Sequence, residues 1–133
     1  MQGLIYVLRS ATQDDHPFIY GAWIKGTWEA PPNRWCPWQL FKVGYAERIG
    51  QRLQDKCLVL CHPDDPDALM GFVCYRKSNE ALIVHWLYVI GMFRRQGLAK
   101  QVLTELGGSP VLTENSVHLT WARKKGCLYD PFA

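Results

Sequence analysis

The sequence predicts a mixed α/β (α+β) fold in which helices flank a central, mostly antiparallel sheet. Strand-like and helix-like segments alternate along the chain in the order β-α-α-β-β-β-α-β-α-β. Residues 81–89 are apolar at almost every position, which is typical of a central strand covered by helices on both faces. The length of 133 residues and the apolar fraction of 48% suit one hydrophobic core. We therefore expect residues 1–133 to form a single domain.

The first part of the chain is expected to form one strand and two helices. Residues 4–8 are rich in β-formers, and the polar run that follows supplies capping residues for a helix from Pro17 to about Lys25. Residues 26–37 contain three prolines, which predict a loop. A second helix is expected over residues 38–54, because its apolar side chains recur with helical spacing.

The rest of the chain is expected to begin with a strand pair. Residues 57–61 and 69–76 are strand-like runs separated by a turn rich in proline and aspartate, so they should pair antiparallel. The central strand 81–89 follows a short polar turn. After it the pattern predicts a helix over 97–106, a strand over 111–112, a helix over 115–125 and a strand over 127–129.

Composition disfavours several classes of protein. A net charge of +3 is too small for the continuous basic stripe of a nucleic-acid-binding protein, and it suits a small anionic ligand better. No run approaches the roughly 18 to 20 apolar residues of a membrane span, and the N-terminal apolar run is too short for a signal sequence. We therefore expect a cytoplasmic protein that has no membrane partner.

The five cysteines favour free thiols over a disulfide framework, because their number is odd and no export signal precedes them. Cys57, Cys61 and His62 could form part of a metal site. No second ligand pair with zinc spacing follows them, so we expect no metal and interpret these cysteines as buried thiols.

The turn after the central strand predicts a phosphate-binding site. A helix start presents unpaired backbone N–H groups and the positive end of the helix dipole. Gly97 would let the backbone approach phosphate oxygens closely, and Ala99 is small. Arg94 and Arg95 add positive charge. A short glycine-containing turn before a helix is also common without any ligand, so the turn alone leaves both interpretations open.

The surrounding sequence resembles motif A of the GNAT superfamily of N-acetyltransferases. Leu-Tyr-Val at 87–89, four further residues and then Arg-x-x-Gly-x-Ala at 94–99 match that motif in spacing. Met70–Val73, Asn115 and Gly126 match further family positions, so the resemblance extends from about Leu4 to Pro131. It implies acetyl-CoA, or another acyl-CoA, as co-substrate. The implied coenzyme contacts are Leu87, Tyr88, Val89, Arg94, Arg95, Gln96, Gly97, Leu98, Ala99 and Asn115.

The resemblance also implies where the chemistry takes place. The strand at 84–89 should diverge from the strand at 111–112 and leave a slot for the pantetheine arm. His85 occupies the position of one of two catalytic histidines in serotonin N-acetyltransferase, and the other position is Ile83 here. A base with a pKa near 7 could deprotonate an amine, although a lone strand histidine can equally serve packing alone.

The general acid and the acceptor site are less clearly marked. Many family members carry a tyrosine seven residues after the helix-opening asparagine, but Ala122 stands there, so Tyr129 is the candidate substitute. Trp28, Trp35 and Trp38 fall where the family usually binds its acceptor, and aromatic faces attract amines. The alternative is that they cover the core.

We therefore expect an acyl-CoA-dependent N-acyltransferase that acts on a primary amine of a small molecule or protein. The resemblance to the family favours acetyl as the transferred group. The alternative is a catalytically weak CoA-binding sensor or interaction module with the same fold. Whether the chain forms a homodimer stays open.

Overall fold

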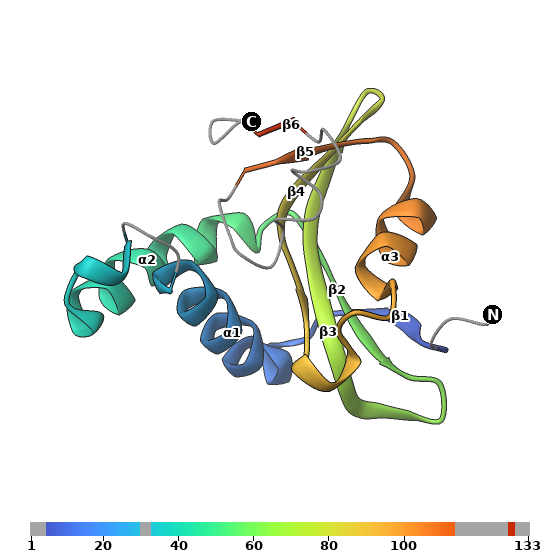
Figure 1. The fold of residues 1–133 in the computed structure, drawn as a ribbon, viewed down its shortest axis with the longest axis horizontal. Coiled ribbons are helices and arrows are strands. Elements are labelled where there is room, and N and C mark those ends of the chain that lie inside the picture. The colour runs from blue at the N-terminus through green and yellow to red at the C-terminus, as the bar shows by residue number, and fades with distance from the viewer. Residues whose placement is uncertain (1–4, 30–32, 114–127, 130–133) are drawn as a thin grey trace.

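The computed structural model describes residues 5–29, 33–113 and 128–129, which form a six-stranded sheet with helices on both faces (Figure 1). The strands lie in chain order across the sheet, and the first four are antiparallel, whereas β4–β5 and β5–β6 are parallel. The strands are β1 Val7–Ser10, β2 Lys56–His62, β3 Asp65–Ser78, β4 Ala81–Val89, β5 Ser109–Leu112 and β6 Leu128–Tyr129. The α-helices are α1 His16–Trp28, α2 Trp38–Arg52 and α3 Leu98–Leu106.

The predicted fold class is confirmed, and the bounds of several elements differ from the prediction. β3 begins at Asp65 rather than at residue 69, within the predicted turn. β1 begins at Val7 rather than at residue 4, because its pairing with β2 runs from Val7 opposite Cys61 to Ser10 opposite Leu58. α1 continues to Trp28, beyond the predicted end near Lys25. The first prolines of the predicted loop stand after Glu29. A proline disfavours helical conformation in the residue directly before it, so these prolines allow the helix to continue to Trp28.

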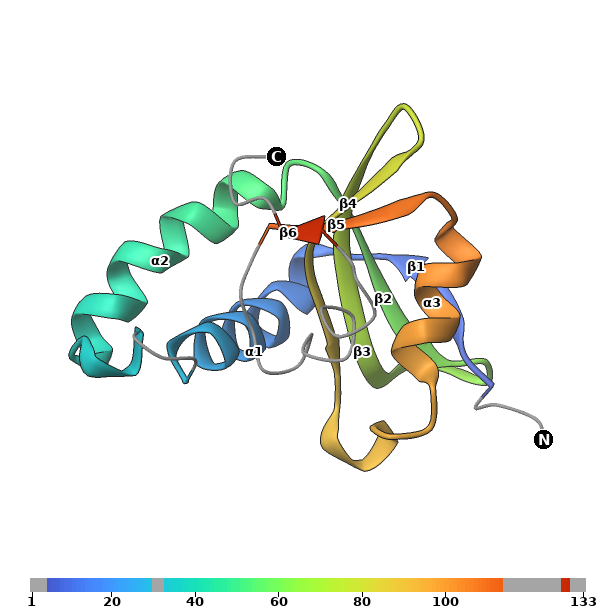
Figure 2. The same ribbon diagram turned by 45° about the horizontal axis from the view of Figure 1, so that its top comes forward.

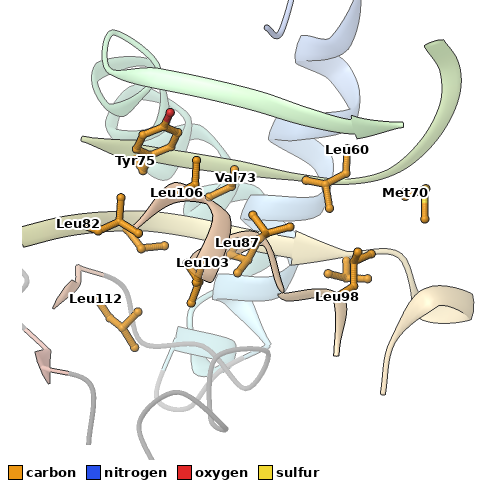
Figure 3. Packing of buried hydrophobic residues seen from close by; sticks show 13 residues of the cluster. Leu60, Met70, Val73, Tyr75, Leu82, Leu87, Leu98, Leu103, Leu106 and Leu112 are labelled. Carbon is orange, nitrogen blue, oxygen red and sulfur yellow. The ribbon is translucent and has the colours of Figure 1, made fainter. Parts of the chain in front are cut away.

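The central strand is apolar on both faces, as predicted, because each face packs against a separate helical layer. α1 and α2 cover one face and α3 covers the other (Figures 1 and 2). Leu82 and Leu87 of β4 pack toward α3, where Leu98 and Leu103 complete the cluster (Figure 3). On the opposite face Trp86 stacks on the α1 side chain Trp23, with ring centroids 5.8 Å apart. The two layers hold β4 at the centre of the molecule.

β4 contains a β-bulge at His85. Cys74 of β3 is opposite Trp86, and the next β3 residue, Tyr75, is opposite Val84, so one residue of β4 has no partner in the ladder. A bulge bends its strand and re-aims the side chain of the extra residue. It comes directly after Val84, the residue at which β4 stops pairing with β5.

Gly71 allows β3 to approach β4 closely next to this region. It lies opposite Val89, and a Cβ atom at Gly71 would overlap the backbone carbonyl of Tyr88. Because the obstacle is backbone rather than a flexible side chain, the strand pair can accommodate a larger residue only by moving apart.

Gly71→Ala should therefore lower the free energy of unfolding by about 2–3 kcal/mol, the usual range for overpacking a well-packed site. The measurement is urea denaturation followed by circular dichroism. Gly44→Ala in α2 is the matched control, because a Cβ there meets nothing within 4 Å, and it should stabilise the helix by about 1 kcal/mol. Equal stability of the Gly71→Ala variant and the parent would contradict the close approach.

Candidate functional site

The second half of β4 presents an open edge of the sheet. The N–H of Ile90 donates to the carbonyl of Met70 at 2.8 Å, and in an antiparallel ladder such hydrogen-bonded positions alternate with positions that point away. The backbone N–H and C=O groups of Leu87 and Val89 therefore point away from β3. β5 pairs with β4 only as far as Val84, so within the described ranges no strand pairs with these groups. An extended chain that carries amides can pair with such an edge.

Backbone conformation shapes the turn that connects this edge to α3. A short 3₁₀ helix, Gly91–Phe93, follows the strand, and Arg95 and Gly97 then adopt left-handed conformations with φ of 63° and 76°. α3 begins at Leu98, and Gln101 is the first residue whose N–H donates back, to the carbonyl of Gly97. The N–H groups before it are those that a helix leaves without intrahelical partners, and such groups at a helix start can bind an anion.

The predicted coenzyme residues divide into two groups in the structure. Arg94, Arg95, Gln96 and Gly97 are exposed on the turn. Leu87 and Leu98 are each only 2% exposed, and Ala99 packs against the same core, so these residues can offer a ligand their backbone but not their side chains.

Arg94 bridges the turn and the strand. Its Nε donates to the carbonyl oxygen of Val89 at 2.6 Å, and its guanidinium lies 5.3 Å from the centroid of the Tyr88 ring. The guanidinium therefore lies beside the open edge, and it already occupies one of the acceptor groups there.

His85 is fully enclosed, with no exposed surface, and both of its ring nitrogens have a partner. Nε2 lies 2.7 Å from Oδ2 of Asp55, and Nδ1 lies 3.2 Å from Oγ1 of Thr113. A carboxylate can only accept, so Nε2 carries the proton and Nδ1 of the neutral ring is an acceptor. The Thr113 hydroxyl lies within reach of two acceptors, Nδ1 and the Val84 carbonyl oxygen at 3.4 Å, and its one proton can be donated to only one of them at a time. Burial lowers the pKa of His85 below the ordinary value, and the hydrogen bond to Asp55 offsets only part of this effect.

Asp55 links this buried histidine to solvent. Its side chain is 32% exposed, and Nε of Arg76 lies 3.9 Å from the same Oδ2 atom. Asp55 also lines a cavity of about 320 Å³, together with Lys56, Tyr75, Arg76 and Lys77. Sequence reasoning missed both Asp55 and Thr113, because each is about 30 residues from His85 and neither stands in a motif.

The three tryptophans predicted for acceptor binding lie where α1 ends and α2 begins: Trp28 ends α1, Trp35 ends the short 3₁₀ helix Asn33–Trp35, and Trp38 begins α2. These ends of α1 and α2 are remote from the sheet (Figure 1). Trp28 and Trp38 are in edge-to-face contact, with ring centroids 5.1 Å apart, and Nε1 of Trp28 donates to the carbonyl of Cys36. Trp35 is separate from this pair and 77% exposed. The structure thus brings two of the three together, away from the open edge of β4.

Two further predicted residues lie at the C-terminal side. Tyr129 belongs to β6, where its backbone is opposite Leu112 of β5. Asn115 and Ala122 are outside the described residues, as is the helix predicted between 115 and 125. The role of Tyr129 as general acid and that of Asn115 in coenzyme binding stay predictions.

The described part of the chain lacks two features, a cluster of metal ligands and a membrane-spanning helix. Its His, Cys, Asp and Glu side chains form no group of three that could hold a metal ion. Its helices include none with the length and apolar character needed to cross a bilayer.

Comparisons with known proteins give one family and one fold. The model of the acetyltransferase (GNAT) family matches residues 12–106. An inferred acetyltransferase from Pyrococcus furiosus is 14% identical with a TM-score of 0.57, and the match covers 92% of each chain. One from Clostridium difficile 630 is 14% identical with a TM-score of 0.56, and the match covers 96% of this chain and 92% of that one.

A third inferred acetyltransferase, from Pyrococcus horikoshii, is 21% identical with a TM-score of 0.54. The match covers 94% of this chain but 43% of the other, so the chain spans less than half the length of that protein. At these identities the solved structures support the fold alone. No curated protein matches the chain significantly.

The environment of His85 predicts a neutral imidazole at pH 7 with its proton on Nε2. Long-range ¹H–¹⁵N NMR spectra should show this tautomer, and the pKa of His85 in the folded protein should lie below that in the urea-unfolded chain. Because the pKa is lowered on folding, the contribution of His85 to stability is present at neutral pH and is lost as the pH falls through the unfolded and then the folded pKa. A proton on Nδ1, or a pKa raised on folding, would contradict the assignment.

Proposed function

The chain belongs to the acetyltransferase (GNAT) family, and on this basis we propose that it transfers an acyl group, with acetyl as the first candidate, from coenzyme A to a primary amine. The acceptor is a small molecule or a protein. The observation that carries the proposal is the open edge of β4, which leads directly into an anion-binding turn. The test is release of free thiol from acetyl-CoA in the presence of a panel of amines: lysine, spermidine, tryptamine and a lysine-containing peptide.

The turn suits the pyrophosphate of the coenzyme. The N–H groups at the start of α3 point toward the turn, and Arg95 adds a positive charge that is exposed to solvent. A Cβ atom at Gly97 would meet nothing within 4 Å, so the space beside this residue is open to a ligand.

The edge of β4 suits the pantetheine arm. The arm carries two amides, which would pair with the backbone groups of Leu87 and Val89 in the manner of an added strand. An incoming amide would replace Arg94 at the Val89 carbonyl and release the guanidinium for the phosphates. The extended arm is about as long as four extended residues, because it has about as many bonds along its chain. Four residues of β4 separate Val89 from His85. The thioester at the end of the arm would therefore lie near the point where β4 and β5 separate.

The reaction needs a neutral amine and a route for its proton. The amine nitrogen forms a bond to the acyl carbon, the carbon–sulfur bond breaks, and the coenzyme leaves as a thiolate. His85 is the proposed base, because it is neutral, lies near the separation of the strands and has an Nδ1 atom that can accept a proton. Thiolate is a tolerable leaving group, so the step does not depend on Tyr129 as an acid.

A coenzyme-binding module without turnover is the second candidate. The observation that favours it is the complete burial of His85, which prevents direct contact between the ring and bulk solvent. Binding of acetyl-CoA without thiol release with any amine in the panel would support this module over the enzyme.

Gly97→Glu should reduce acetyl-CoA affinity at least about a hundredfold, because a carboxylate at the turn repels the pyrophosphate and occupies its space. The left-handed conformation strains the new residue by about 1 kcal/mol, which the fold should survive. The measurement is isothermal titration calorimetry with acetyl-CoA. Gly21→Glu on the exposed side of α1 is the matched control and should bind normally, whereas undiminished affinity of Gly97→Glu would exclude the turn as the coenzyme site.

His85→Gln should lower kcat about a hundredfold or more and leave acetyl-CoA affinity within about twofold, because glutamine keeps hydrogen-bonding groups but cannot act as a base. In the parent protein kcat/KM should fall at acidic pH with an apparent pKa below the ordinary histidine value, since the neutral ring is the active form. The variant should lack this acidic limb. Steady-state kinetics from pH 5 to 9 measure both effects, and an unchanged profile would leave His85 with a packing role only.

A further inference from the structure

Two thiols lie opposite each other on the paired strands β2 and β3. Cys57 of β2 is the partner of Cys74 of β3 in the antiparallel register. The carbonyl of Cys57 accepts from the N–H of Ala11 at 3.0 Å, so the backbone groups of Cys57 point toward the β1 side of the strand and away from β3. The two cysteines therefore form a non-hydrogen-bonded pair, in which opposite Cα atoms are only about 4.5 Å apart.

This position satisfies the geometric conditions for a disulfide. A bridge needs Cα atoms about 4.4–6.8 Å apart and side chains that project toward each other. Directly opposite residues project from the same face of a sheet, and both cysteines pack in the hydrophobic cluster between the sheet and the helices α1 and α2. The two thiols are in hydrogen-bond contact, and this contact, ahead of burial, raises the pKa of Cys74. The strands can thus accept a bridge without a change of register.

We propose that Cys57 and Cys74 form a redox-modification site, which a hydroperoxide converts into a cross-strand disulfide and a thiol reductant restores, and that this bridge alters the contact between Asp55 and His85. Both cysteines are free thiols in the structure. The disulfide is therefore a second state of the protein and not part of a framework that holds the fold. Formation of the bridge does not require acyl transfer.

The two thiols differ in their access to an oxidant. Cys57 is half-buried, whereas Cys74 has no exposed surface. A hydroperoxide from solvent therefore meets Cys57 first. The Cys57 thiolate attacks one peroxide oxygen, the oxygen–oxygen bond breaks, and Cys57 becomes a sulfenic acid, while the second oxygen leaves as water when the oxidant is hydrogen peroxide.

Cys74 then completes the bridge. Its raised pKa keeps it protonated, so it resists direct oxidation, but it lies beside the new sulfenic acid and attacks it within the same molecule. The sulfur–sulfur bond forms, the sulfur–oxygen bond breaks, and the Cys74 proton leaves with the hydroxide as a second water. Two thiols and one hydrogen peroxide thus give one disulfide and two waters, with two electrons passing from sulfur to oxygen.

Oxidation changes the support of Asp55. Sγ of Cys74 donates to the carbonyl of Arg52 at 3.3 Å, and the same carbonyl accepts from the N–H of Asp55 at 3.0 Å. Asp55 in turn holds Nε2 of His85 at 2.7 Å. A disulfide sulfur has no hydrogen to donate, so the bridge removes one of the bonds that fix the turn before β2. It also ties Cys57, two residues after Asp55, directly to β3.

The experiment treats the full chain with hydrogen peroxide, blocks the remaining thiols with N-ethylmaleimide and maps the disulfides by mass spectrometry. Trypsin leaves Cys57, Cys61 and Cys74 in one peptide, residues 57–76, because no lysine or arginine lies between its ends. A second protease that cuts before aspartate then separates Cys74 from the two cysteines of β2. Peroxide should link Cys57 to Cys74 and lower the number of free thiols from five to three, and dithiothreitol should restore all five.

Serine variants test which thiols take part. Cys57→Ser and Cys74→Ser should each abolish the link, and Cys74→Ser, whose hydroxyl can still donate to Arg52, should accumulate a sulfenic acid at Cys57 that dimedone traps. Cys61→Ser is the matched control, because Cys61 is a buried thiol on the same strand with Leu69 opposite it, and its link should form at a rate within about twofold of the parent. A link to another cysteine, or a sulfinic acid at Cys57 of the parent without a link, would overturn the site. If Cys74→Ser fails to fold, Cys57→Ser decides the same question.

The ring of His85 reports the effect on Asp55. Its ¹⁵N signals should shift when the parent protein is oxidised and return on reduction, and they should stay unchanged in peroxide-treated Cys57→Ser. Unmoved His85 signals in the bridged parent would overturn the effect on the Asp55 contact. Both measurements use the chain without acetyl-CoA, so their outcome is separate from that of the proposed function.

Discussion

The separation of β4 from β5 is the constraint on which the candidate site depends. The two strands pair in parallel from Ala81 to Val84, and the N–H of Thr113, the last described residue after β5, donates to the Val84 carbonyl. The bulge at His85 follows directly. The remainder of β4 keeps its ladder with β3 on one side, and among the described residues no strand pairs with its other side. The open edge, the placement of His85 and the position of Thr113 all follow from this one divergence.

The helical layers stabilise β4 where it separates from β5. Because β4 packs against helices on both faces, its second half stays in place without β5 beside it. Trp86 is held against α1 and Leu87 against α3. The coenzyme turn benefits from the same arrangement. Leu98 anchors the first residue of α3 in the core, which fixes the direction of the backbone N–H groups that precede the second turn of the helix.

Much of the fold could be predicted because its signals are local. The run Ala81–Val89 is apolar on both faces, which predicts a central strand with its observed bounds. Gly97 stands where a residue in the left-handed conformation precedes the helix, so the sequence also predicts the turn and the start of α3 to within one residue. The partners of His85 could not be predicted, because the bulge depends on register with β3 and Asp55 approaches from a distant connection. The continuation of α1 to Trp28 could not be predicted either, because the prolines that end the helix stand after it and do not mark its last residue.

The bond between Arg94 and the Val89 carbonyl has a consequence for the free protein. A sheet edge with unpaired amides is a template for strands of other molecules and hence a starting point for aggregation. A charged side chain laid over that edge is one of the devices by which soluble proteins avoid such pairing. Arg94 occupies a carbonyl that a foreign strand would need, and it does so with a cation that like-charged copies repel. The coenzyme would then bind by displacing the Arg94 side chain from the Val89 carbonyl, so that this carbonyl is hydrogen-bonded both before and after the coenzyme binds.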